Sequence, residues 1–207
     1  MVHYFNQGGA LMWPILFCLI IGIIIAIVKL WLLFRARINS RGFLEQILQL
    51  VKTKGVADAI ALCDRTRGPV PALFHAGLTR VEKGLEYVNA SIENEAALQM
   101  STLEKAMPWL STVISVAPML GFLGTVQGMI IAFDQIARSN DIVPSEVAHG
   151  ISVALLTTFF GLVVAIPMQF FYNWFLSIID GMIADMQDSA NQLIENLIDL
   201  GVLKKVE

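Results

Sequence analysis

Three long apolar blocks constrain this chain more than any other feature of its sequence. They cover residues 10–34, 109–133 and 147–175, and Lys29 is the only charged residue within them. A helix needs roughly 20 apolar residues to cross the hydrocarbon core of a bilayer, so each block is long enough to span a membrane. The first block lacks the basic leader and the cleavage site of a signal peptide, and we expect it to stay as a membrane anchor.

Composition and tryptophan placement agree with this interpretation. The chain of 207 residues is 56% hydrophobic and only 15% charged, with a mean hydropathy of +0.67. Average soluble proteins have about 25% charged residues. All four tryptophans lie near the ends of the apolar blocks, where the indole ring meets the headgroups: Trp13, Trp31, Trp109 and Trp174. The sequence therefore predicts an all-α membrane protein with three transmembrane helices.

The distribution of basic residues predicts the orientation. Several follow the first block closely: Arg35, Arg37, Arg41, Lys52 and Lys54. The connection between the second and third blocks, residues 134–146, contains only Arg138. Because cytoplasmic segments are enriched in Lys and Arg, we expect residues 35–108 to be cytoplasmic and the short connection to be outside. The N-terminus is then outside and the C-terminus inside.

Apolar residues recur at helical spacing in both predicted cytoplasmic segments. One apolar stripe leads into the second span: Leu85, Val88, Ile92, Ala96, Met100, Leu103 and Met107. Another follows the third span with the spacing of a coiled-coil seam: Leu176, Ile179, Ile183, Met186, Ala190, Leu193, Leu197 and Leu200. We expect the second and third spans to extend as helices into a cytoplasmic helical bundle. The predicted organisation is an anchor (1–34), a cytoplasmic helical segment (35–108), spans at 109–133 and 147–175 around a periplasmic loop (134–146), and a cytoplasmic C-terminal helix (176–207).

No constellation of residues indicates an enzyme, a metal site or a cofactor. Cys18 lies inside a span and Cys63 in the cytoplasmic segment, so they are not expected to pair. The three histidines, His3, His75 and His149, are isolated in the sequence. There is no phosphate-binding loop or nucleophile elbow. A formal net charge of −3 argues against nucleic-acid binding.

Small residues form two matching stripes on the second and third spans. Residues three and four apart share one face of a helix, and both stripes follow spacings of four, three and four: Gly121, Thr125, Gly128 and Ala132, and Ala154, Thr158, Gly161 and Ala165. Small residues let helix backbones approach closely in lipid. We assign the glycines and alanines of these stripes, with Gly124 and Pro167, to helix packing.

The two threonines of these stripes are the candidate ion-path residues. At 1.5 Å per residue, Thr125 and Thr158 are expected at nearly the same depth on antiparallel spans. A threonine in a membrane helix commonly bonds its own backbone, and this alternative stays open. Gln127 lies off the stripe and is interpreted as an interhelical hydrogen-bonding group.

The second and third spans contain no Asp, Glu, Lys or Arg. Proton relays in membranes commonly use a titratable carboxylate, and a threonine hydroxyl does not titrate at physiological pH. If the complex conducts protons, we therefore expect another chain to supply the carboxylate.

Two motifs resemble the MotA/TolQ/ExbB proton-channel family and, within it, the ExbB/TolQ branch. They are APMLGFLGTVQGMIIAF at 117–133 and GISVALLTTFFGLVVAIPMQFFYNWF at 150–175. Thr125 matches the threonine of the LGTV motif, Thr158 that of the third-span motif, and Pro167 the proline of AIP. The branch often has a glutamate where this chain has Val153.

The resemblance implies a bacterial inner-membrane ring, typically of five copies, around the helices of an ExbD/TolR-like single-span partner that carries an intramembrane aspartate. It implies that proton or sodium flow drives mechanical work on a periplasm-spanning protein such as TonB or TolA. Two alternatives remain open at this point: a flagellar-type stator subunit, and a helical scaffold that does not conduct.

Overall fold

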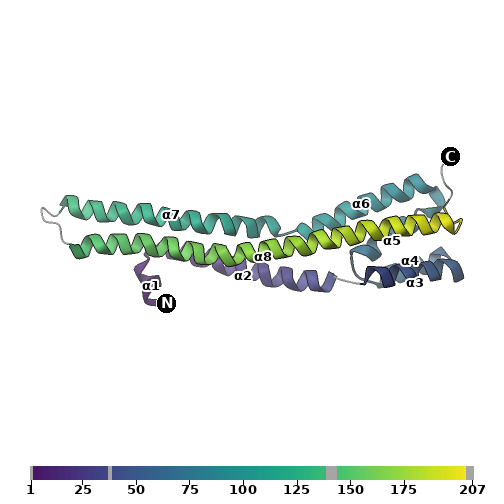
Figure 1. The fold of residues 1–207 in the computed structure, drawn as a ribbon, viewed down its shortest axis with the longest axis horizontal. Coiled ribbons are helices and arrows are strands. Elements are labelled where there is room, and N and C mark those ends of the chain that lie inside the picture. The colour runs from purple at the N-terminus through teal and green to yellow at the C-terminus, as the bar shows by residue number, and fades with distance from the viewer. Residues whose placement is uncertain (1, 37–38, 139–143, 204–207) are drawn as a thin grey trace. The chain divides into compact units, whose positions relative to one another are not determined.

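The computed structural model describes residues 2–36, 39–138 and 144–203, and within these ranges it contains helices and turns and no strand. The helices in chain order are α1 (Val2–Gln7), α2 (Met12–Ala36), α3 (Ser40–Thr53), α4 (Val56–Arg65), α5 (Pro69–Leu78), the short 3-10 helix η1 (Val81–Lys83), α6 (Leu85–Glu104), α7 (Met107–Arg138) and α8 (Pro144–Asp199) (Figure 1). Arg37, the centre of the predicted outer loop (139–143) and the last residues (204–207) lie outside the described residues.

Three helical stretches are long and apolar enough to cross a membrane, as the sequence predicts. They lie within Met12–Thr53, Leu85–Ala137 and Val147–Asp199. The protein is therefore an all-α membrane protein with three candidate spans. Both helices extend into the predicted loop (134–146), because α7 continues to Arg138 and α8 begins at Pro144.

The chain divides into two compact units. Residues 1–29 and 106–174 form the membrane unit, and residues 30–105 and 175–207 form the second unit. Helix α8 contributes its first part to the membrane unit and its remainder to the second.

In the membrane unit, α2 packs closely on α7 and α8 at Gly22. A Cβ atom placed on Gly22 would lie 2.9 Å from Met168 Sδ and 3.3 Å from Val113 Cγ1. Nearer the N-terminus, the rings of Phe5 and Trp13 meet edge to face with centroids 5.5 Å apart. The absence of a side chain at Gly22 thus allows the three helices to approach one another.

The junction before the second span differs from the continuous helix predicted there. Helix α6 ends at Glu104 and α7 begins at Met107, and Ala106 between them has φ of +73°. Pro108 has no N–H to donate, and its ring would clash with the Glu104 carbonyl in an uninterrupted helix. The third span does continue as predicted, because α8 runs without a break through Pro167.

The second unit contains a compact set of short helices. Helix α3 contacts α4, α4 contacts α5, and α5 contacts α6. Asn39 caps α3 by accepting a hydrogen bond from the Gly42 N–H at 3.3 Å. The rings of Phe43 and Phe74 stack with centroids 5.8 Å apart, which joins α3 to α5. These contacts build a core that includes α4 and α5, which have 10 residues each and are too short to be stable alone.

The end of α8 presents its predicted apolar seam to the core of this unit. Most of the seam beyond residue 178 is buried, including Ile179, Met186, Ala190, Leu193 and Leu197. Leu176, at the start of the predicted seam, is 37% exposed. The acidic residues Asp180, Asp185 and Asp188 are exposed, as expected for the solvated face of the helix.

Phe74→Ala should destabilise the second unit by about 3–5 kcal/mol, because the ring is fully buried and its removal leaves a cavity. Leu98→Ala is the matched control, since Leu98 is 63% exposed. Protease susceptibility of the detergent-purified protein in increasing urea measures both. Equal resistance of the two variants would contradict the assigned core.

Cys63 should react slowly with maleimide in the folded protein. Burial, assisted by the neighbouring Asp64 carboxylate, raises the pKa of the Cys63 thiol from 9.0 to about 12. The thiolate is the reactive form, so near pH 8 its labelling should be about a thousandfold slower than in urea. Because the folded-state pKa is the higher one, Cys63 does not oppose folding below pH 9, where the thiol is neutral in both states. The folded state loses stability as the pH rises from 9 toward 12, because only the unfolded chain then carries the thiolate. Rapid labelling of folded protein at pH 8 would contradict the assigned burial.

Candidate functional site

The contact between α7 and α8 in the membrane unit is built from small residues. Figure 1 shows the two helices side by side along this unit. Each contributes a row of small residues at spacings of four, three, four and four: Ala117, Gly121, Gly124, Gly128 and Ala132 on α7, and Gly150, Ala154, Thr157, Gly161 and Ala165 on α8. All ten are buried. We call these two rows the α7–α8 seam.

Backbone atoms of the two helices touch along the seam. A Cβ on Gly121 would lie 2.9 Å from the Thr157 carbonyl oxygen, and one on Gly128 would lie 2.6 Å from that of Gly150. In the reverse direction, a Cβ on Gly161 would lie 2.7 Å from the Ala117 carbonyl oxygen. No side chain fits at these glycines without moving the helices apart, so their role is close packing in an environment that lacks water.

Thr157 is the largest residue of the seam. It is completely buried, and its side chain lies directly over Gly124, where any Cβ would overlap it. Its hydroxyl bonds backbone carbonyls of its own helix, those of Val153 at 3.1 Å and Ala154 at 2.9 Å. Thr157 therefore acts as a knob that fixes how far α7 can slide along α8.

Thr158 and Thr125 border the seam, and both are half-buried. The Thr158 hydroxyl donates across the helix pair to the Gly121 carbonyl at 3.1 Å. The Thr125 hydroxyl donates within α7 to the Phe122 carbonyl at 2.6 Å. Thr125 thus bonds the backbone of its own helix, which is the alternative left open by the sequence, whereas Thr158 makes an interhelical bond.

The two hydroxyls lie about one helical turn apart along the helix axes. Gly121 opposes the stretch from Thr157 to Gly161, and Gly128 opposes Gly150 and Ala154. By the same antiparallel register Thr125 lies opposite Leu155, three residues or ~4.5 Å from the level of Thr158.

The donated protons determine what these hydroxyls can bind. A hydroxyl has one proton and two lone pairs, and here the proton is already engaged by a backbone carbonyl. Each oxygen therefore offers acceptor positions to its surroundings. Such a pair suits a cation, a hydronium ion or a protonated carboxylic acid better than a carboxylate, which would need donors.

The remaining predicted residues are more scattered. Pro167 and Gln127 are exposed outside the seam. Val153 is half-buried, and its Cγ1 lies 3.7 Å from the position of a Cβ on Gly9, so this position faces the N-terminal segment. Sequence reasoning missed Ala117, Gly150 and the packing role of Thr157. The uninterrupted small-residue spacing through Gly124 is the signal that could have revealed them.

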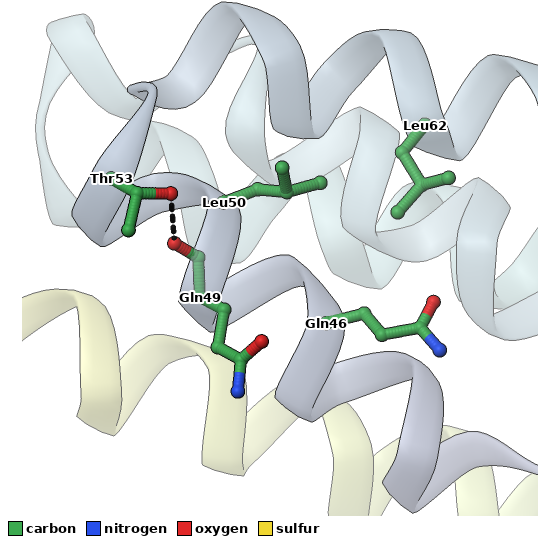
Figure 2. Close-up of a pocket in the computed structure, with 5 residues that line it drawn as sticks. All are labelled: Gln46, Gln49, Leu50, Thr53 and Leu62. Atoms are coloured by element: carbon green, nitrogen blue, oxygen red, sulfur yellow. Dashed lines mark hydrogen bonds between the residues drawn. The ribbon is translucent and has the colours of Figure 1, made fainter.

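A pocket lies against α3 and α4 in the second unit and has a volume of about 350 Å³. Figure 2 shows its lining residues, Gln46, Gln49, Leu50, Thr53 and Leu62. The Thr53 hydroxyl donates to the Gln49 carbonyl at 2.8 Å. None of these five side chains titrates near neutral pH, so the lining offers no acid or base for catalysis. Across the described residues, no group of three or more His, Cys, Asp or Glu side chains is arranged to hold a metal ion.

Three apolar helices and a close-packed, hydroxyl-bordered helix pair define a multi-pass membrane protein with polar groups inside its spanning region. The sequence pattern of the MotA/TolQ/ExbB proton channel family matches residues 65–188. The match covers more than half of the chain, and the chain belongs to this family of inner-membrane proteins.

Relatives with assigned names are consistent with the ExbB branch. A biopolymer transport protein ExbB homolog from Methanothermobacter thermautotrophicus is 29% identical over 201 residues, which cover 97% of this chain and 70% of the relative. Biopolymer transport protein ExbB from Pseudomonas putida is 30% identical over 188 residues, covering 84% of this chain and 57% of that protein. ExbB from Salmonella typhimurium is 29% identical over 196 residues, covering 86% and 79%.

A solved structure shares the fold. The structure of C. jejuni MotAB superposes with a TM-score of 0.57 at 16% identity, covering 88% of this chain and 75% of that chain. At this identity the likeness establishes the helical architecture alone.

Gly124→Ala should disrupt the membrane unit, because the new methyl group overlaps the Thr157 side chain. Thr157→Gly in the same chain should restore packing by removing the overlapping atoms. Thermal stability in detergent, followed by size-exclusion chromatography after heating, measures the loss and the rescue. A double variant no more stable than Gly124→Ala alone would contradict the knob contact. Met119→Ala is the control, since Met119 is 68% exposed.

Proposed function

We propose that this protein is the ion-conducting subunit of an inner-membrane motor complex. The observation that carries the proposal is the pair of hydroxyls at Thr125 and Thr158, whose protons are engaged by backbone carbonyls inside the spanning region. The family match and the ExbB-named relatives support it. The MotAB likeness is one of fold and does not favour a flagellar role.

In the proposed complex, several copies of this chain, five by resemblance, surround the helices of an ExbD/TolR-like partner with an intramembrane aspartate. The N-terminus is periplasmic and the C-terminus cytoplasmic, in accord with the basic residues that follow the first span, such as Arg35 and Arg41. The second and third spans, residues 109–133 and 147–175, contain no Asp or Glu. In the proposed complex the titrating group therefore comes from the partner.

The hydroxyl geometry then favours one protonation state of the partner carboxyl group. The protonated acid donates its one O–H to a free lone pair of Thr125 or of Thr158, whereas the ionised form finds no donor at either hydroxyl. A charged group without partners in a site of low dielectric is strongly disfavoured. The partner helix therefore passes this level when its carboxyl group is protonated, which ties its movement to proton entry.

The driving force is sufficient for such a step. Moving one charge across about 100 mV releases about 2.3 kcal/mol, which is enough to bias the position of one packed helix relative to another. The work would pass to a periplasm-spanning protein of the TonB or TolA type.

Thr125→Val and Thr158→Val should each lower ion flux by about tenfold or more, because valine keeps the shape and removes the acceptor oxygen. Thr125→Ser and Thr158→Ser should retain flux. The measurement is proton and sodium flux in liposomes that contain the protein co-purified with its genomic neighbour. Size-exclusion chromatography of each variant checks assembly. Wild-type flux in both valine variants would refute the proposed ion path and leave a scaffold role.

A further inference from the structure

A pair of exposed amides lies on α8 within the third span. Gln169 and Asn173 are one turn apart, and the Gln169 Nε2 group donates to Asn173 Oδ1 at 3.0 Å. Both side chains are exposed, although they precede Trp174, the residue that marks the end of the span. Their position is unexpected for a helix face that meets lipid.

Lipid exposure would be costly for these groups. Each amide has one acceptor oxygen and two N–H donors, and the bond between them uses one donor of Gln169 and part of the acceptor capacity of Asn173. The other polar groups of the pair face outward. Polar groups without partners cost several kcal/mol in hydrocarbon, so this face requires water or another polar surface.

The pair shares a helix face with Thr158. Residue 169 follows residue 158 by 11 positions, which is about three turns and ~16 Å along the axis. Leu162 and Ile166, 45% and 56% exposed, occupy the turns between them. The face therefore has a hydroxyl in mid-span, an apolar section, and two amides near the end of the span that bears Trp174.

We propose that Gln169 and Asn173 line the water-filled cytoplasmic exit of the ion path. This inference rests on the proposed function and on its orientation of α8. An ion that leaves the level of Thr158 crosses the apolar section and regains polar contacts at the amides. Because amides do not titrate, they hydrate the ion without binding the proton, and release stays fast.

The neighbouring residue supplies a matched control. Phe170 follows Gln169 directly, points about 100° away around the helix, and is 76% exposed. It has the exposure expected of a residue that contacts lipid. Gln169 and Phe170 thus lie at nearly the same depth, but the proposal places Gln169 in water and Phe170 in lipid.

The test is thiol accessibility in native membranes. Gln169→Cys, Asn173→Cys and Phe170→Cys are each made in a chain carrying Cys18→Ala and Cys63→Ala, expressed with its genomic neighbour. A charged, membrane-impermeant methanethiosulfonate is added to inverted vesicles. Water-exposed thiols ionise and react, so the first two variants should label at least about tenfold faster than the third. Labelling of Gln169→Cys as slow as that of Phe170→Cys overturns the proposal, including the case in which another helix covers the amides.

Ion flux separates this proposal from the proposed function. Gln169→Leu combined with Asn173→Leu should lower flux by about tenfold with normal assembly, and serine at both positions should restore it. Wild-type flux in the leucine variant overturns the exit. Fast labelling in a complex that conducts no ion overturns the proposed function and the exit together. Slow labelling with normal, threonine-dependent flux overturns the exit alone.

Discussion

The close approach of the α7 and α8 backbones is the constraint on which the membrane unit depends. In hydrocarbon, apolar side chains gain little by leaving lipid for one another, so helices are held by van der Waals contact and by hydrogen bonds. Gly121, Gly128 and Gly161 each face a backbone atom of the opposite helix at a distance that excludes a side chain. The same proximity brings the Thr158 hydroxyl within reach of the Gly121 carbonyl. Packing and polar chemistry therefore have one geometric origin.

This arrangement separates two roles that threonine plays in the spans. Thr157 is fully buried, bonds its own helix, and fills the space over Gly124. Thr125 and Thr158 lie at the borders of the seam, where both side chains are partly exposed and open to a partner helix in the proposed complex. A hydroxyl whose proton is engaged behaves as an acceptor, and this property gives the proposed path a preference for protonated or cationic species.

The second unit follows the physics of a water-soluble helical bundle. Glycines with positive φ, Gly55, Gly68 and Gly84, lie between its short helices. Its core is formed by large buried side chains such as Phe74 and Leu193. The end of α8 takes part in this core through its apolar seam. One helix thus carries both a small-residue surface suited to lipid and a large-residue surface suited to water.

The sequence by itself determined the spans, the helical class and the family, because apolar length and small-residue motifs are local properties. The end of α6 at Glu104 depends on the backbone conformation of Ala106, which the apolar pattern does not contain. The face of α7 that meets α8 was decided only by the tertiary structure. Stripes through Thr125 and through Gly124 both contain small residues, and adjacent positions differ by about 100° around a helix. Only the packed pair shows that Gly124 receives Thr157 while Thr125 lies at the border, because the choice depends on which side chain fits the opposite backbone.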